Sequence, residues 1–480
     1  MKPASPLYII TRITVTAGAG VRFFQQERSF MNLIRPLARF IFIIFLLTVP
    51  SRLHGAVLSS APLTLDDAVR TGIEKSRSLE IARLDREIAG QKIRETWSEV
   101  LPQISASSSY TRTLKPSVLL MPPNQSFPTG VLETSSDNAA RASIDLRQTL
   151  FDRSAFAGIK AASIVRKMSE EVYRGVEANV VTDIKIAYFD VLISKEQLTL
   201  IEQSMARWEQ SRKDTRAMFR QGVVADIDTL KAWLSVENLR PELMQAENRV
   251  ATSMTRLKNV MGIPVESNVV LSGKLEITAA SYPTDIATAY REAINARPEL
   301  RQLNYQVQAE GEKVNAARAE HFPLLSAFGK LESQTAFNDG TSYSEAKWPT
   351  SSAVGLQLTM PLFTGFRISA KVEQARIGQL QTRTRYEELK SAIRAEIEVR
   401  VLNFKESQKR IEVQSKTISV AERSYNISRL RFKEGIGSRL ELTDAELQLN
   451  KAKTNYFQAV YDNLAAATQL EKALGRRVAK

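Results

Sequence analysis

The chain carries one sequence pattern twice, and this duplication limits what it can fold into. The segment Phe219–Asp228 returns as Arg431–Glu441 when the two are aligned on their glycines, and Leu257–Gly262 returns as Leu470–Gly475 at the same spacing. Similarity between segments so far apart indicates duplication of a whole structural unit, not a short solenoid repeat. We therefore expect two units, each with the order helix, strand, strand, helix.

Each unit is expected to open with two helices that end at a proline. Pro102 and Pro323 stand at corresponding places, and proline stops a helix because it has no backbone N–H and clashes with the preceding turn. The expected helices are Leu65–Lys75 and Ser78–Val100 in the first unit, and Thr284–Asn295 and Pro298–His321 in the second. The pattern assigns residues 57–280 to the first structural repeat and residues 281–480 to the second.

Two segments of each repeat then alternate with the period of a β-strand. In Val354–Met360 every second residue is apolar, and Ala142–Arg147 alternates in the same way. A strict period of two gives a strand one apolar face and one polar face. Weaker alternation marks Ile104–Arg112 and Leu325–Glu332, and the segments expected to be loops are about Lys115–Asn138 and Gln334–Ser351.

The N-terminal segment resembles a secretory signal. Within Met31–Ala56, two arginines precede the apolar run Phe40–Val49, and small residues follow it. The run is too short to cross a bilayer as a helix, which takes about 20 apolar residues. We therefore expect residues 1–56 to be an N-terminal extension plus a signal peptide, with translation starting at Met31; a membrane anchor is the alternative reading.

Alternating strands of about ten residues in an exported chain favour a membrane β-barrel over a soluble sandwich, because a tilted membrane strand has this length. Four strands cannot close a barrel, since about eight are needed before side chains fill the interior. Open sheet edges in lipid would leave backbone groups without hydrogen bonds. A membrane barrel therefore requires several copies of the chain.

Two very long helices complete the pattern. Neither Ser154–Arg220 nor Arg367–Lys433 contains a proline, and at about 1.5 Å per residue each would be a rod of roughly 100 Å. A glycine turn and a returning helix follow each rod, near Asp226–Met261 and Arg439–Leu474. Pro241 interrupts the first returning helix and should kink it.

The composition excludes most kinds of chemistry. The chain has no cysteine and two histidines, so disulfides, thiolate chemistry and histidine catalysis have little basis. The sequence has no P-loop, no glycine-rich dinucleotide turn, no metal-ligand cluster and no nucleophile constellation. The net charge is +14, but basic residues alternate with acidic ones along the helices, as on solvated helix faces. We expect no enzyme activity, no cofactor, no metal and no nucleic-acid partner.

In their order and duplication, these motifs resemble those of the TolC-like outer-membrane efflux protein family, the outer membrane factors of tripartite exporters. The resemblance covers about Leu63–Gly475. It is carried by the opening Leu63–Val69, the Leu101–Pro102 step, the Leu150–Asp152 and Pro361–Phe363 steps from strand to helix, and the paired glycine turns. Each motif is weak alone, and their shared order makes the match specific.

The resemblance implies a mostly α fold with a membrane β-barrel. Three copies would form a twelve-stranded barrel in the outer membrane, continuous with a long periplasmic α-helical barrel. The implied function is the passive exit duct of a tripartite efflux or type I secretion system. The implied partners are outer membrane lipid, a periplasmic adaptor protein and an inner-membrane pump.

The resemblance also places the two glycine turns at the periplasmic tip, where family members meet the adaptor. The residues that would dock are Gly222, Val223, Val224, Gly435 and Ile436. Glycine suits a tight helix reversal because it adopts positive φ without strain. The alternative is an ordinary helix C-cap with a local hydrophobic contact.

Family members close the tunnel near the same turns with acidic residues, and Asp228, Glu441 and Asp444 match by position. Glu441 and Asp444 are three residues apart and would share one helix face. Around a three-fold axis each acid would form a ring, which favours cations. The chain departs from the family at Gly437, where some members have a gate-locking arginine, and at Phe432, which replaces a tyrosine. The alternative is a solvated helix surface.

Two rival functions remain open at this point. An exported helical coiled-coil scaffold or adhesin without a pore would explain the long helices, but would have no use for four alternating strands. Within transport, the duct could serve protein secretion or small-molecule efflux, because substrate choice is expected to reside in the pump.

Overall fold

The computed structural model describes residues 62–123, 128–277, 282–283, 285–341 and 345–476, all of which belong to the unit Ser60–Lys480. The expected N-terminal extension and signal peptide at 1–56 lie outside the described residues. The expected repeat boundary at residue 280 also falls outside them, so the division into 57–280 and 281–480 stays a prediction.

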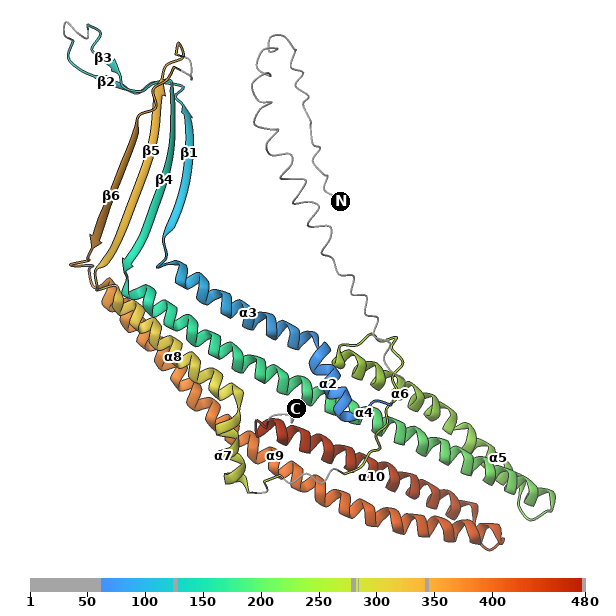
Figure 1. Ribbon diagram of the computed structural model, residues 1–480. Coiled ribbons are helices and arrows are strands. Elements are labelled where there is room, and N and C mark those ends of the chain that lie inside the picture. The colour runs from blue at the N-terminus through green and yellow to red at the C-terminus, as the bar shows by residue number, and fades with distance from the viewer. Residues whose placement is uncertain (1–61, 124–127, 278–281, 284, 342–344, 477–480) are drawn as a thin grey trace, which may run out of the picture. The chain divides into compact units, whose positions relative to one another are not determined.

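The elements follow one order twice (Figure 1). The first half contains α2 (Leu65–Lys75), α3 (Arg77–Ser98), β1 (Gln103–Arg112), β4 (Asn138–Phe151), α4 (Arg153–Arg220), α5 (Asp226–Glu237) and α6 (Leu239–Met261). The second half contains α7 (Ile286–Ala296), α8 (Pro298–Ala319), β5 (Leu324–Phe337), β6 (Thr350–Thr359), α9 (Arg367–Lys433) and α10 (Arg439–Ala473). The expected order of helices and strands is confirmed in both halves.

Side-chain caps fix where several helices begin. The Thr64 hydroxyl accepts a hydrogen bond from the backbone N–H of Asp67 at the start of α2. Asp152 caps α4 in the same way, where the chain turns from strand to helix. Ser438 caps α10 directly after the second glycine turn. Such caps satisfy N–H groups that have no partner within the helix.

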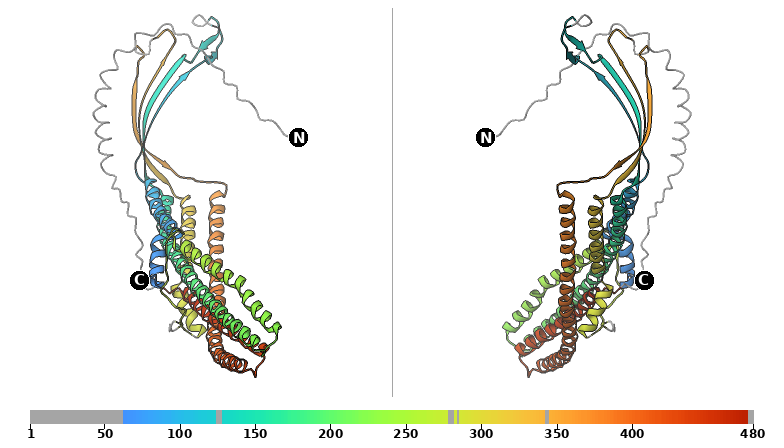
Figure 2. Two further views of the ribbon diagram at one scale, coloured as in Figure 1. Left: turned by 90° about the vertical axis from the view of Figure 1, so that its right-hand side faces the viewer. Right: turned by 90° about the vertical axis from the view of Figure 1, so that its left-hand side faces the viewer.

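One antiparallel sheet joins the two halves. Its strand order is β1-β4-β5-β6, so β4 and β5 pair across the repeats, and β1 and β6 are the edges. Figure 2 shows that the strands curve along their length. Strands β4 and β5 have 14 residues each and extend past the segments expected from alternation. Many of the added residues are small or polar, such as Asn138–Ala140 and Ser333–Ala336, and the ladder between the halves pairs these two stretches.

The sheet has one apolar face and one polar face, as the alternation predicted. Ile144 of β4, Leu331 of β5 and Ser352 of β6 lie on one face in register, together with Val354, which is 88% exposed. The opposite face carries polar and charged side chains, such as Glu332. A single chain therefore leaves its apolar sheet face uncovered.

A short ribbon lies in a segment that was expected to be a loop. Strands β2 (Val118–Leu120) and β3 (Val131–Glu133) form an antiparallel pair within the segment that connects β1 to β4 in sequence. The expectation of a loop over Lys115–Asn138 is therefore wrong at these residues. The segment is rich in prolines and polar residues, which predicts a loop. Strands of three residues are too short to show the alternation by which a strand is recognised.

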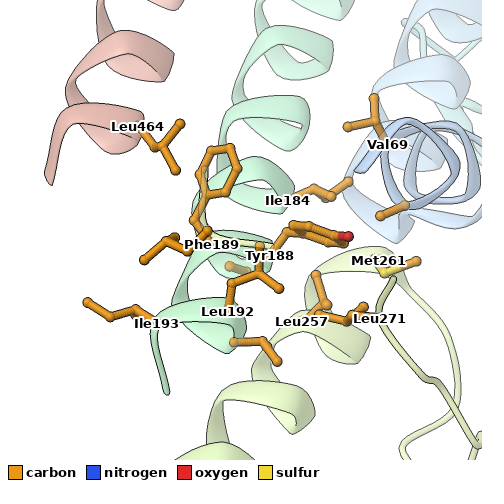
Figure 3. Close-up of a cluster of buried hydrophobic side chains, with 14 of the residues drawn as sticks. Val69, Ile184, Tyr188, Phe189, Leu192, Ile193, Leu257, Met261, Leu271 and Leu464 are labelled. Atoms are coloured by element: carbon orange, nitrogen blue, oxygen red, sulfur yellow. The ribbon is translucent and has the colours of Figure 1, made fainter. Parts of the chain in front are cut away.

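Helix α4 contacts α2, α3, α5, α6, α8 and α10, whereas α9 contacts α7, α8 and α10. The main core gathers apolar side chains of α2, α4, α6 and α10 around Ile184, which is fully buried. The members labelled in Figure 3 are Val69, Ile184, Tyr188, Phe189, Leu192, Ile193, Leu257, Met261, Leu271 and Leu464. A second core joins α7, α8, α9 and α10 around Ile397 and Leu470.

The two returning helices differ. In the first half the helix breaks at Asn238 into α5 and α6, three residues before Pro241, so the expected kink is confirmed. In the second half α10 runs unbroken over 35 residues. Across the described part of the chain, no helix is both long and apolar enough to cross a membrane.

Candidate functional site at the glycine turns

The two helix reversals have nearly the same backbone. Gly222 and Gly435 both adopt positive φ, 74° and 75°. After the first glycine, the N–H of Val223 donates to the Met218 carbonyl at 2.9 Å, and Ile436 donates to the Arg431 carbonyl at 3.0 Å. A Cβ at either glycine would meet nothing within 4 Å. The turns therefore require glycine for its backbone conformation and not for lack of space.

Apolar side chains stand in solvent at both turns. Val223 is 56% exposed and Ile436 is 72% exposed, whereas Val224 is half-buried. Leu440, which the sequence analysis did not single out, is 77% exposed in the first turn of α10. The local contact of a helix C-cap does not cover these side chains. The end of each helical hairpin therefore presents an apolar surface within a single chain.

The three expected gate acids fall into two settings. Glu441 and Asp444 are exposed on α10, and neither forms an ion pair with another described residue. Asp228 is half-buried in the first turn of α5, and its negative charge attracts the guanidinium of Arg439. No group of three acids or histidines among the described residues could hold a metal ion. A ring of carboxylates would therefore need more than one copy of the chain.

Arg439 is a site residue that the sequence analysis missed. It is 9% exposed, and its Nη1 donates to the Ser211 hydroxyl at 2.9 Å and to the Thr215 hydroxyl at 3.0 Å, both on α4. The guanidinium also lies over the Trp208 ring, with Cζ 5.3 Å from the ring centroid. Burial lowers the pKa of Arg439, and the Asp228 carboxylate opposes this. Arg439 thus links the first turn of α10 to α4.

Two turns further along α10, a second buried polar layer joins the same helices. The Glu446 side chain is buried, and its Oε1 accepts hydrogen bonds from Arg207 Nε at 2.7 Å and from Ser204 at 3.2 Å. Arg207 also donates to the Asn450 amide oxygen at 2.9 Å. Glu446 Oε2 has no hydrogen-bond partner in the described structure. An ion pair therefore holds this layer together, while one carboxylate oxygen of Glu446 accepts no hydrogen bond in the described structure.

A spacing signal for both charged residues was present in the sequence. Arg439 and Glu446 recur with Leu442 and Leu449 at intervals of three and four residues, which is the buried face of a helix. Sequence reasoning assigned charged residues to solvent and so overlooked this face. The ends of the helical hairpins therefore present exposed carboxylates and exposed apolar side chains, which can bind cations weakly or contact an apolar partner surface.

Comparisons with known proteins agree with this architecture. The profile of the outer membrane efflux protein family matches residues 69–263 and 289–476, one block in each half. A probable efflux pump outer membrane protein, TtgC of Pseudomonas putida, is 22% identical over 413 residues, covering 86% of this chain and 82% of that protein. Outer membrane protein TolC of Escherichia coli is 21% identical over 405 residues, covering 82% of this chain and 78% of that protein.

Solved structures show the same fold. The outer membrane channel CmeC of Campylobacter jejuni aligns with a TM-score of 0.71 at 18% identity, covering 86% of this chain and 85% of that chain. At this level of identity the likeness speaks for the fold alone. The family match in both halves follows the duplication seen in the sequence.

Proposed function

The chain belongs to the outer membrane efflux protein family, and from this membership we propose that three copies form the exit duct of a tripartite exporter. The protein lies in the outer membrane and extends into the periplasm. The sheet is the observation that supports the proposal most strongly. Within one chain its two edge strands lack a partner on one side, and its apolar face is uncovered. Two copies would supply eight strands, whose interior side chains fill, so an open conduit needs at least three.

The long helices supply the second part of the duct. Helices α4 and α9 have 68 and 67 residues, and at about 1.5 Å per residue each is a rod of roughly 100 Å. Helix α4 begins two residues after β4 ends, and α9 follows β6 after a short connection, so twelve strands around an axis would continue into a wall of helices. The proposed duct is a twelve-stranded barrel in lipid joined to a periplasmic helical barrel.

The partners follow from the two ends of this duct. Outer membrane lipid would cover the apolar sheet face, and a periplasmic adaptor would meet the apolar tips at Val223 and Ile436. The adaptor would join the duct to an inner-membrane pump, which selects the substrate. The names of relatives such as TtgC refer to efflux pumps, which favours efflux over protein secretion here. A scaffold or adhesin gives the sheet no role.

The proposed gate uses the charged residues near the tips in two ways. Glu441 and Asp444 are exposed and unpaired, so their copies around the axis would form acidic rings that favour cations. Asp228 acts instead on Arg439, whose hydroxyl contacts hold α10 against α4. Arg439 thereby supplies a link near the place where Gly437 lacks the arginine of some family members.

Conduction by the purified protein tests this function. We expect detergent-extracted protein, reconstituted into planar bilayers without pump or adaptor, to give a stable cation-selective conductance. Family-type channels are passive, so no energy source is needed. If membranes incorporate the protein but show no conductance at any applied voltage, the protein is not a duct, and the alternative function of a scaffold without a pore is favoured.

Docking at the tips gives a separate prediction. Replacing Gly222 and Gly435 with valine should place a β-branched residue at positive φ and strain each turn by about 1–3 kcal/mol. We expect dye efflux in the native host to fail while the amount of trimer in the membrane stays near normal. Gly378→Val is the control, because Gly378 lies within α9 without positive φ and with open space around it. Full efflux in the double variant would exclude the tips as the docking surface.

A further inference from the structure

The polar face of the sheet carries its charges in one group on the two central strands. Strands β4 and β5 lie side by side (Figure 1), and their register places Lys330 opposite Asp145. Arg141 and Arg147 lie on the same face as Asp145, because side chains alternate along a strand. Glu332 lies on the face of Lys330 for the same reason. Three cations and two carboxylates therefore share a small area of this face.

The cations of this group are exposed, whereas its carboxylates are more buried. The side chains of Arg141 and Lys330 are 58% and 47% exposed, but that of Glu332 is only 11% exposed. Arg141 Nε lies 3.5 Å from Glu332 Oε1, and the Lys330 ammonium pairs with the same carboxylate. Asp145 is half-buried and accepts a hydrogen bond from the Ser143 hydroxyl at 2.9 Å. The group therefore presents a basic surface.

This excess of positive charge belongs to the polar face alone. Arg147 is exposed and forms no ion pair with another described residue. Lys347, just before β6, borders a hollow over the sheet that Arg141 also lines. Among the residues that β1, β4, β5 and β6 pair, the opposite face has one charged side chain, Arg112 at the end of β1. That side chain is neutralised by Asp339 at 2.6 Å.

We propose that Arg141, Arg147 and Lys330 form a basic band on the inner wall of the duct, and that this band binds anionic solutes with carboxylate or phosphate groups. The inference rests on the proposed function in one respect, because the polar face lines a lumen only when copies of the chain close the barrel. Each copy then adds the same excess charge, and a ring of cations attracts anions. Guanidinium groups also match the oxygens of carboxylates and phosphates in geometry. The band is opposite in sign to the exposed carboxylates of Glu441 and Asp444 near the tips.

Binding of a small polyanion tests the basic band. The probe is tripolyphosphate, and isothermal titration calorimetry on detergent-extracted protein measures its affinity at low salt, where exposed charges are least screened. Replacing all three cations of the band with glutamine leaves the two carboxylates in excess. We expect the affinity to fall by roughly tenfold or more, because several close charge contacts are lost in each copy. The control Arg70→Gln, Arg83→Gln and Lys92→Gln makes the same change in charge at exposed cations of α2 and α3, and we expect no loss.

A variant with the opposite expected effect separates charge from damage to the barrel. Asp145→Asn with Glu332→Gln removes the two carboxylates and makes the band more basic, so the affinity for tripolyphosphate should rise. A barrel that had merely lost its structure would not bind the anion more tightly. An affinity that neither variant changes, or an equal loss in the control on α2 and α3, would overturn the proposal.

Conductance gives a second measurement with a defined side. The polar helices cannot cross lipid, so in a planar bilayer the mouth of the barrel opens into the chamber opposite the one that received the protein. Tripolyphosphate in that chamber should reduce the conductance of the unmodified protein, and the glutamine variant of the band should resist this block. A protein that conducts nothing contradicts the duct, while calorimetry still decides whether the band binds anions. A conducting protein in which neither affinity nor block responds to the variants contradicts the band and leaves the duct intact.

Discussion

Replacing both Glu441 and Asp444 with lysine will turn a cation-selective conductance into an anion-selective one. Each copy exchanges two exposed carboxylates for two ammonium groups one turn beyond the tip. Copies gathered around the axis would replace acidic rings with basic ones, and the sign of the local field sets which ions enter. The measurement is the reversal potential in planar bilayers under a salt gradient.

Graded variants sharpen this prediction. Glu441→Gln with Asp444→Asn should weaken cation selectivity without inverting it, and Asp444 should matter more than Glu441. Asp228 should matter least, because its carboxylate faces Arg439. Lysines at Glu80 and Glu87 on α3 change the charge by the same amount far from the tips, and we expect no shift there. An unchanged reversal potential in the double lysine variant at the tip would show that these acids line no constriction.

Truncating Arg207 to alanine will loosen α10 from α4 by about 3–5 kcal/mol, because it leaves a buried carboxylate without its counter-charge. Glu446 is 2% exposed, so water cannot readily take the place of the lost guanidinium. Local opening is best measured by amide hydrogen exchange in the peptides of α10 around residue 446. Protection should fall there and persist near Leu470, which is fully buried in the second core.

Two comparison variants separate charge burial from general damage. The double variant Arg207→Met with Glu446→Leu removes both charges and should recover most of the protection, since an apolar pair of similar volume often replaces a buried ion pair at no loss. Lys416→Ala removes a partner from the exposed pair with Glu412 and should change nothing measurable. Exchange in Arg207→Ala that matches the unmodified protein would mean that the layer contributes nothing to the seam.

The sequence predicted helices better than strands, for physical reasons visible in particular elements. Helix α2 begins and ends where expected because Thr64 caps it and a polar turn follows. The bounds of α9 were also predicted to the residue, between a glycine and a glycine turn. Strands β4 and β5 were predicted too short at Asn138–Arg141 and Ser333–Ala336, because these residues are mostly small or polar and do not alternate. Those ends are strand because they pair with neighbouring strands, including the strand of the other half, and no local pattern records such pairing.

At the glycine turns, too, some features could be predicted from the sequence and others could not. Positive φ at Gly222 and Gly435 was predictable, because a tight helix reversal restricts the residue types that fit. Arg439 and the Glu446 layer were not predicted, since the burial of a charged side chain depends on which helix packs against it. The gate acids could be placed on α10 from sequence, but their gathering into rings depends on other copies of the chain.

Covalent linkage of the two sheet edges tests the central claim, that three copies close one barrel. Ser108 on β1 and Ser352 on β6 are exposed, lie on the same sheet face and belong to opposite edges. With no native cysteine to interfere, the variant Ser108→Cys with Ser352→Cys can be treated in outer membranes with a short bismaleimide and separated on a denaturing gel. We predict a closed three-chain product, with neither single-cysteine variant linking beyond two chains. A single-chain product, or a ladder that continues past three, would contradict the account.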